Sequence, residues 1–179
     1  KIDKIIIGLS QWREYKEKAI TEIGEKGKEL INEEDNILIF GDSSTIFSIL
    51  KTVAEEIRKT IRVYVMECRH RFGVTQEGEN MAQKIWNMGY RVFLISDISF
   101  AHYCCGDEAI KINKIFIGCN IIHPEDKFVV NTIGSLAVAM VAKQSGIPLY
   151  VAGMRWKVFK KDRIKIIDEK RLLHLLLAE

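Results

Sequence analysis

Small polar residues follow the apolar run Asn36–Phe40 and form the first segment with ligand-binding chemistry. Residues 41–45 read Gly-Asp-Ser-Ser-Thr. If a helix begins here, its free N–H groups and the hydroxyls of Ser43 and Ser44 would hold a phosphate group. The segment lacks the lysine and the spacing of a Walker A loop, which excludes that kind of nucleotide site. Asp42 is unsuited to an anion site but suits a helix cap, so a purely structural cap is the alternative.

An arginine occupies the loop after the second apolar run. Arg69 lies within residues 67–71, which read Glu-Cys-Arg-His-Arg, and its guanidinium carries a planar set of donors that suits a phosphate or a carboxylate. The alternative is a surface arginine paired with Glu67 or Glu77. The neighbouring charge also predicts a lowered pKa for the thiol of Cys68, although position alone does not make a cysteine a nucleophile.

Two later segments supply further polar groups. Asp97 follows the third apolar run, where a carboxylate would hold a ribose hydroxyl or cap the next helix, and both readings stay open. Asn131, Thr132 and Gly134 lie where another helix is expected to begin. They would let a ligand approach the helix terminus, or would cap the helix and pack it tightly against the sheet.

The histidines and cysteines predict no metal site and no cofactor. The histidines are scattered without metal-like spacing, at His70, His102, His123 and His174. The four cysteines contain no C-x-x-C pair, and the adjacent Cys104 and Cys105 are poorly placed to bridge each other or to share a zinc ion. We therefore expect reduced thiols in a reducing compartment.

Five short apolar runs alternate with helical patterns, and this alternation must position the polar loops. The expected strands are residues 36–40, 61–66, 90–96, 114–118 and 147–152, and the expected helices are 11–31, 43–57, 78–88, 100–109 and about 131–145. Nearly continuous apolar strands are typical of a parallel sheet covered on both faces. We predict a three-layer α/β domain at 35–179, preceded by a helical segment at 1–34. The strand-to-helix loops then share the carboxyl edge of the sheet, where open α/β folds bind ligands.

Composition and charge are those of an ordinary globular chain. The 179 residues are 47% hydrophobic and 28% charged, with a net charge of +3, which predicts one domain with a real core. Because no apolar run could span a bilayer and no signal peptide is visible, we expect a cytosolic protein. The chain begins with Lys1 rather than Met, so we expect that residues were removed before it.

A basic stretch follows the last expected strand. Residues 155–171 hold eight Lys or Arg and three Asp or Glu. A solvated edge strand or hairpin is expected here, because lysines on an edge strand prevent mispairing. A patch for nucleic acid or an acidic partner is the alternative. Residues 172–177 are expected to form a last short helix.

Six segments, taken in order, resemble one protein family. They are residues 36–45, 63–69, 94–97, 114–118, 130–135 and 147–152. Together they resemble the initiation factor 2B alpha/beta/delta family, which includes regulatory subunits of translation initiation factor 2B, methylthioribose-1-phosphate isomerase and ribose-1,5-bisphosphate isomerase. The resemblance covers about residues 11–157. It implies a Rossmann-like domain that follows a helical domain, of which residues 11–31 resemble the last helix, and it implies assembly into a homodimer or hetero-oligomer through the Rossmann-like domain.

The resemblance also implies where an isomerase would keep its catalytic groups. The catalytic cysteine, aspartate and lysine of that branch match Gly41, Asn120 and Thr132 of this chain. Moving a proton between sugar carbons needs groups that exchange protons, and neither glycine nor asparagine does so. We therefore assign no catalytic residue. Arg69 matches the arginine of the family's Glu-Thr-Arg-Pro motif, with His70 in place of the proline.

Three functions follow as hypotheses. The first is a non-catalytic, initiation factor 2B-like regulatory or binding domain that senses a phosphorylated sugar or nucleotide, because the loop at residues 41–45 is closer to the regulatory subunits. Its expected ligand-binding residues are Asp42, Ser43, Ser44, Arg69, Asp97, Asn131, Thr132 and Gly134. The resemblance implies translation initiation factor 2 as a partner. The second hypothesis is an aldose-phosphate isomerase of the same family, and the third is a nucleic-acid-associated module that uses residues 155–171.

Overall fold

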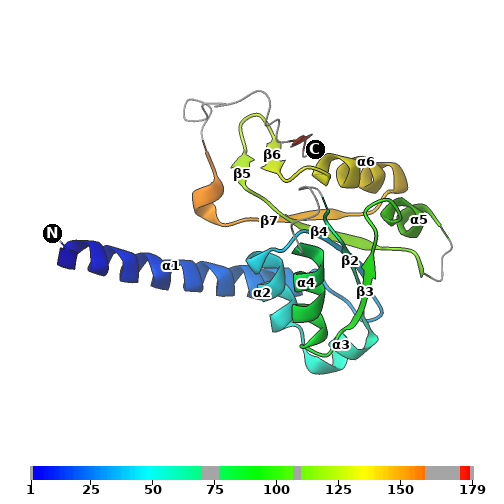
Figure 1. Ribbon diagram of the computed structural model, residues 1–179, viewed down its shortest axis with the longest axis horizontal. Helices are drawn as coiled ribbons and strands as arrows, with labels where there is room; N and C mark the ends of the chain where they lie inside the picture. Colours follow the sequence, from blue (N-terminus) through cyan, green and yellow to red (C-terminus); the bar gives the residue numbers. More distant parts are fainter. Residues whose placement is uncertain (1, 70–76, 107–109, 160–173, 178–179) are drawn as a thin grey trace.

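Five parallel strands form the centre of the computed structural model, which describes residues 2–69, 77–106, 110–159 and 174–177 (Figure 1). The order across the sheet is β3-β2-β1-β4-β7. The strands are β1 (Asn36–Phe40), β2 (Arg62–Met66), β3 (Arg91–Ile95), β4 (Lys114–Gly118) and β7 (Leu149–Ala152). β1 pairs with β2 on one side and with β4 on the other, so Ile39 lies opposite both Val65 and Phe116. From β1 the chain adds β2 and β3 on one side of the sheet, and it then adds β4 and β7 on the other side of β1. The strand order therefore reverses between β1 and β4.

Helices cover both faces of the sheet, as Figure 1 shows. One face carries α2 (Ser44–Thr52), α3 (Glu55–Thr60) and α4 (Glu77–Trp86), and the other carries α5 (Phe100–Cys105) and α6 (Ser135–Ser145). Ile37 and Ile39 of β1 belong to the core beneath α2 and α4. Leu38 and Phe40, the alternate residues, belong to the core beneath α5 and α6. The predicted α/β fold with a parallel sheet is thereby confirmed.

The helix that precedes the sheet is also confirmed. It is α1 (Ile2–Lys28), which begins nine residues before the expected start and extends out from the body of the molecule (Figure 1). No helix within the described ranges is both long and apolar enough to cross a bilayer.

A small antiparallel sheet lies beside the main one and corrects two expectations. Between β4 and α6, where only a loop was expected, β5 (Ile121–His123) and β6 (Phe128–Asn131) form a hairpin. Asn131 therefore ends a strand instead of beginning a helix. α6 starts four residues later, because Gly134 adopts a left-handed conformation with φ of 102° that separates the strand from the helix.

The end of the chain corrects a third expectation. Residues 172–177 were expected to be helical, but β8 (His174–Leu177) is a strand that pairs antiparallel with β6, with Leu175 opposite Val130. A short apolar run fits either structure, and the free edge of β6 decides for the strand. In the basic stretch, Arg155–Lys157 form the 3₁₀ turn η2 and Val158 bridges to Ile122. Residues 160–171 lie outside the described part of the chain.

The helix expected over residues 43–57 is divided into α2 and α3. Val53 ends α2 in an extended conformation with ψ of 137° and buries its side chain in the core. The Nε of Arg58 in α3 donates to the carbonyl of Val53 at 2.7 Å. The helix therefore ends at Val53, because the extended conformation buries its side chain and the hydrogen bond from Arg58 satisfies its carbonyl.

A buried ion pair fixes the amino end of β1. Asp35 is 3% exposed, and its carboxylate accepts hydrogen bonds from Lys114 Nζ at 2.6 Å, Asn113 Nδ2 at 3.0 Å and the backbone N–H of Asn32 at 2.7 Å. Both Asn113 and Lys114 belong to the start of β4 or the turn before it. The carboxylate thus joins the two strands between which the sheet order reverses.

Gly24 and Gly27 allow α1 to approach α2. A Cβ atom at Gly27 would overlap the side chain of Ile49, and one at Gly24 would lie 2.8 Å from Ser48 Oγ. The hydroxyl of Ser48 donates to the carbonyl of Ile20 at 3.0 Å, which is possible only at such close approach. The two glycines therefore form the surface of α1 that contacts α2.

We predict that Gly27→Ala destabilises the chain by about 1–3 kcal/mol, since the added methyl group must displace the buried Ile49. Gly8→Ala is the matched control on the same helix. No atom lies within 4 Å of its added Cβ, so the better helix propensity of alanine should stabilise the helix by up to about 1 kcal/mol. Urea unfolding followed by circular dichroism measures both. Equal gains in stability for the two variants would show that α1 does not pack on α2 through Gly27.

Candidate functional site

The loops after β1 and β4 meet at the carboxyl edge of the sheet, where the strand order reverses. Open α/β sheets bind ligands at this kind of position. A Cβ atom at Gly118, the last residue of β4, would lie 2.8 Å from Ser43 Oγ. The two loops are therefore in direct contact, and we call this edge of the sheet, where Arg69 and Asp97 also lie just after β2 and β3, the crevice.

Ser43, and not Asp42, caps α2. The backbone N–H of Ile46 donates to Ser43 Oγ at 3.5 Å, and the hydroxyls of Ser43 and Thr45 are 2.8 Å apart. Thr45 Oγ1 in turn donates to the carbonyl of Ala152 at the end of β7, at 3.2 Å. Ser44 is exposed on the first turn of α2. This segment therefore ties three elements together while leaving one hydroxyl in solvent.

Asp42 was expected to cap a helix, but it pairs with a lysine of α4 instead. Its carboxylate accepts from Lys84 Nζ of α4 at 2.7 and 2.9 Å. The lysine neutralises a negative charge that would otherwise repel an anion from the start of α2. Nothing in the sequence pattern indicated this pair, because the two residues are 42 positions apart.

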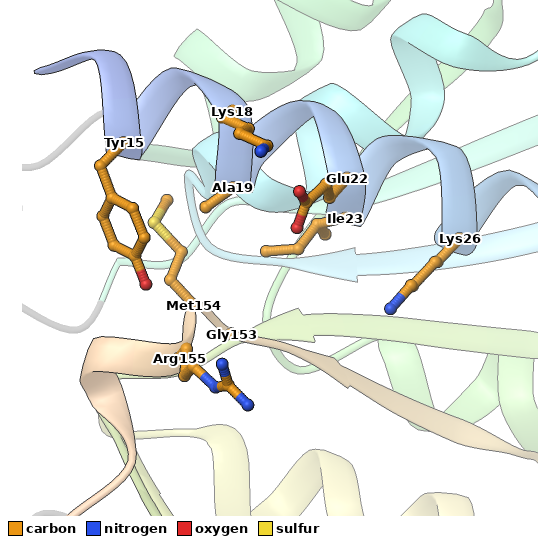
Figure 2. Close-up of a pocket in the computed structure, with 9 residues that line it drawn as sticks. All are labelled: Tyr15, Lys18, Ala19, Glu22, Ile23, Lys26, Gly153, Met154 and Arg155. Carbon is orange, nitrogen blue, oxygen red and sulfur yellow. The ribbon is translucent and has the colours of Figure 1, made fainter.

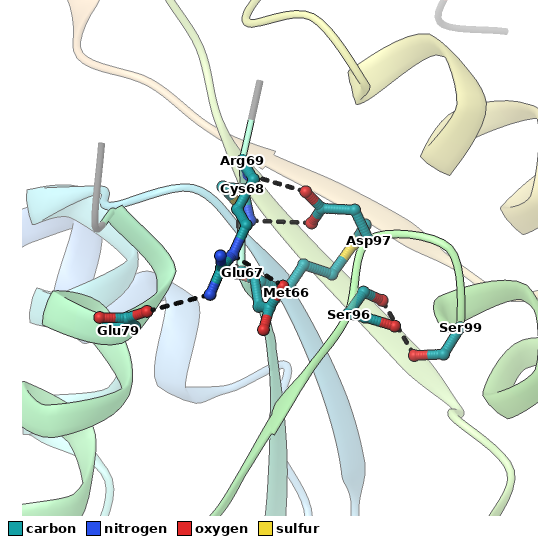
Figure 3. A network of polar contacts seen from close by, with 8 residues as sticks. All are labelled: Met66, Glu67, Cys68, Arg69, Glu79, Ser96, Asp97 and Ser99. Carbon is teal, nitrogen blue, oxygen red and sulfur yellow. Dashed lines mark hydrogen bonds and ion pairs between the residues drawn. The ribbon is translucent and has the colours of Figure 1, made fainter. Parts of the chain in front are cut away.

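Asp97 holds the loop after β2, as Figure 3 shows. Its two carboxylate oxygens accept the backbone N–H groups of Cys68 at 2.8 Å and Arg69 at 2.7 Å. The N-cap residue of α5 is Ser99, which makes no side-chain capping bond. Of the two readings left open for Asp97, helix capping is therefore wrong, and both oxygens already serve the neighbouring loop.

Arg69 extends its guanidinium toward α4 (Figure 3). Its Nε lies 3.0 Å from Glu67 Oε2, and its Nη2 lies 3.5 Å from Glu79 Oε1. The alternative of a surface arginine paired with glutamate is thus realised through Glu67, with Glu79 in place of Glu77. The side chain remains 58% exposed, so solvent and solutes reach it.

Burial controls the chemistry of Cys68. The residue is fully buried, its thiol donates to the carbonyl of Met66 at 3.2 Å, and its sulfur accepts the N–H of Gly41 at 3.1 Å. Burial raises the pKa of this thiol to about 12, although the hydrogen bond from Gly41 favours the thiolate. The expectation of a lowered pKa is wrong, because burial of the thiol raises its pKa more than the hydrogen bond from Gly41 lowers it.

A second buried thiol lies after β4. Burial raises the pKa of Cys119, and the ammonium of Lys157 opposes the rise. Lys157 also donates a hydrogen bond to the backbone carbonyl of Cys119. Next to it, Asn120 is exposed, and its N–H donates to the carbonyl of Val130 at 2.9 Å. The sequence offered no signal for Lys157 beyond its place in the basic stretch.

Asn131, Thr132 and Gly134 shape the corner between β6 and α6. The buried amide of Asn131 donates to Ser135 Oγ at 2.9 Å, and Ser135 donates to the carbonyl of Thr132 at 2.8 Å. A Cβ atom at Gly134 would lie 2.8 Å from the ring of Phe40. This is the tight helix-to-sheet packing that was the alternative to ligand contact. Across the described ranges, no group of three or more His, Cys, Asp or Glu could hold a metal ion.

We predict that Asp97→Ala destabilises the chain by about 1–3 kcal/mol, because two N–H groups lose their acceptor. Asp42→Ala is the matched control: it removes a carboxylate that makes only an ion pair at the surface, and its cost should stay below about 1 kcal/mol. Urea unfolding measures the free energies, and amide hydrogen exchange at Cys68 should accelerate in the first variant alone. Similar losses in the two variants would contradict the role given to Asp97.

Solved structures with the same fold include initiation factor 2B proteins. The translation initiation factor eIF-2B of Pyrococcus horikoshii superimposes with a TM-score of 0.73 at 25% identity, covering 88% of this chain and 54% of that one. The delta subunit of eIF-2B from A. fulgidus gives a TM-score of 0.70 at 22% identity, covering 90% of this chain and 48% of that one.

Curated relatives of similar identity carry two kinds of name. An eIF-2B subunit 2-like protein of Pyrococcus abyssi is 28% identical over 141 residues, which cover 79% of this chain and 47% of that protein. A ribose 1,5-bisphosphate isomerase of Methanocaldococcus jannaschii is 29% identical over 144 residues, covering 80% and 43%. The chain thus spans about half the length of the curated relatives it matches. Because the sequence profile of the initiation factor 2 subunit family matches residues 3–171, nearly the whole chain, the protein belongs to that family.

Proposed function

We propose that this chain is a non-catalytic regulatory or binding domain of its family, which holds a phosphorylated sugar or nucleotide in the crevice without converting it. The observation that carries the proposal is the chemistry at the reversal point between β1 and β4. The resemblance implies that Gly41 and Asn120 stand where the isomerases have their catalytic cysteine and aspartate. Neither side chain exchanges a proton near neutral pH, as sugar isomerisation requires.

Among the residues that the structure describes at the crevice, two carboxylates and two thiols give no substitute for the missing pair. Asp97 is occupied by two backbone N–H groups and Asp42 by Lys84. The thiols of Cys68 and Cys119 are buried, and burial raises the pKa of both. A general base needs a pKa near the operating pH and an open path to its substrate. These groups therefore favour binding over proton transfer.

Binding in the crevice would use the parts of the site that stay open. The start of α2 offers N–H groups and the exposed hydroxyl of Ser44, and a helix N-terminus attracts anions. Arg69 is more than half exposed and contributes donors that suit a phosphate. Asn131, Thr132 and Gly134 would then shape the crevice wall rather than contact the phosphate.

An isomerase is the second candidate, because relatives named ribose 1,5-bisphosphate isomerase match this chain as closely as the eIF-2B-like ones. Such an activity would need another acid or base in place of Gly41 and Asn120. Cys119 adjoins Asn120, but its raised pKa keeps the thiol protonated at neutral pH. This alternative is therefore the weaker one.

We predict that, among ribose-1,5-bisphosphate, methylthioribose-1-phosphate and the nucleoside monophosphates, some compounds will raise the unfolding temperature of the chain and others will not. A ligand at 100 times its Kd stabilises the native state by about 2.7 kcal/mol. Arg69→Ala should remove the shift, whereas Arg91→Ala, at the opposite end of β3, should keep it. Neither sugar phosphate should be converted. Turnover by the chain would establish the isomerase, and an unchanged shift in Arg69→Ala would remove Arg69 from the site.

Assembly through the Rossmann-like domain, as a homodimer or with related subunits, is part of the proposal. Apolar side chains lie exposed on and after β3, where Phe93 and Leu94 are each 44% exposed and Ile98 is 90% exposed. Exposed apolar patches often mark protein interfaces. Translation initiation factor 2 is the further partner that this assignment implies. A cytoplasmic location also belongs to the proposal, because all four cysteines are free thiols.

We predict that sedimentation velocity will show a dimer that Ile98→Asp dissociates, since a charge in an apolar interface loses its hydration. Ile133→Asp, at an exposed position near α6, is the control and should leave the dimer intact. If the chain sediments as a monomer at all micromolar concentrations, or if only the control dissociates it, the β3 edge is not the interface.

A further inference from the structure

A groove separates α1 from the segment that follows β7, and it shares no residue with the crevice. Its volume is about 540 Å³, and Figure 2 shows six residues of α1 on one side and Gly153, Met154 and Arg155 on the other. Ala19, Ile23 and Met154 supply its apolar surface. Ligand sites commonly have volumes of about 300–1,000 Å³ and combine apolar walls with a few polar groups.

The charged side chains that line the groove are mainly positive. Lys18, Lys26 and Arg155 line it together with a single carboxylate, Glu22. Within the ranges that the structure describes, none of these four side chains has a hydrogen bond or ion pair. Lys18 and Lys26 are eight residues apart on α1, or about 12 Å along the helix axis. The groove therefore presents a row of cations instead of one compact anion site.

An aromatic cluster adjoins one end of this row. Tyr15 lines the groove, its ring lies 5.6 Å from that of Trp156, and the ring of Trp156 lies 6.1 Å from that of Trp12. Tyr15 and Trp12 are 50% and 53% exposed, so parts of their rings face solvent. Lys16 adds a cation over the ring of Trp12, at 5.4 Å from its centroid.

We propose that this groove binds a single-stranded nucleic acid, with a base stacked on the cluster of Trp12, Tyr15 and Trp156 and the phosphates along Lys18, Lys26 and Arg155. Proteins that bind single strands combine a positively charged groove with aromatic side chains in this way. The separation of Lys18 and Lys26, about 12 Å along α1, is too long for the one phosphate of a mononucleotide and favours several phosphates of one chain, although the carboxylate of Glu22 repels a phosphate placed directly between them. The proposal is independent of the crevice and of any ligand held there.

Fluorescence anisotropy of the full chain with a labelled ten-nucleotide RNA, followed over a range of salt, tests the proposal. Three phosphate contacts should give a plot of log K against log salt with a slope of about −2, since each contributes about −0.7 on a single strand. Lys18→Ala and Arg155→Ala should each reduce that slope by about 0.7. Tyr15→Ala should weaken binding about tenfold and Tyr15→Phe should preserve it, because the ring supplies the stacking.

Lys51→Ala is the matched control, because Lys51 is exposed on α2 outside the groove, and its binding and slope should equal those of the parent chain. Four results would overturn the proposal. The first is no RNA binding at low salt, and the second is equal binding of a polyphosphate that carries no bases. The third is that AMP binds tightly by itself and displaces the RNA completely. The fourth is RNA binding that survives Lys18→Ala and Arg155→Ala but is lost in Lys160→Ala/Lys161→Ala. The last result would assign RNA binding to residues 160–171 of the basic stretch instead of the groove.

Discussion

Burial of β1 on both of its faces is the constraint on which the other elements depend. Every residue of this strand is buried, and alternate side chains enter two separate cores. Helices must therefore cover both faces, and neighbouring strands must satisfy the backbone on both edges. Because β2 and β4 take those two edges, the loops after β1 and β4 lie next to each other at the carboxyl edge of the sheet, where the crevice is.

The polar groups at the crevice are mostly engaged with one another. Asp97 positions the loop after β2, the sulfur of Cys68 accepts the N–H of Gly41, and Asn131 and Ser135 close the corner before α6. Hydrogen bonds of this kind satisfy backbone and side-chain groups that burial would otherwise leave without a partner. The same residue types in an acid–base site would have to face the substrate. The reactive side chains described at the carboxyl edge thus hold the loops in place.

The sequence predicted the central strands well and the partners of the polar side chains poorly. The bounds of β1 and β4 agree with the expected residues, because each strand contains a short run of large apolar residues, 37–40 in β1 and 115–117 in β4, that suits burial on both faces. The hairpin of β5 and β6 and the strand β8 were missed. β8 depends on its pairing with β6, which lies far from it in the sequence. Likewise, the pairs of Asp42 with Lys84 and of Arg69 with Glu79 depend on how α4 lies over the sheet. Local patterns indicate where an element occurs, but only the packed chain determines which side chains meet.

The close packing of α1 on α2 holds only one half of this long helix. The 27 residues of α1 extend for about 40 Å, and the contacts of Gly24 and Gly27 with Ser48 and Ile49 all lie in its second half. The first half carries exposed apolar side chains, among them Ile5, Ile6 and Leu9. Trp12 and Tyr15 of α1 also contact Trp156, so α1 links α2 to the segment that follows the last strand of the main sheet.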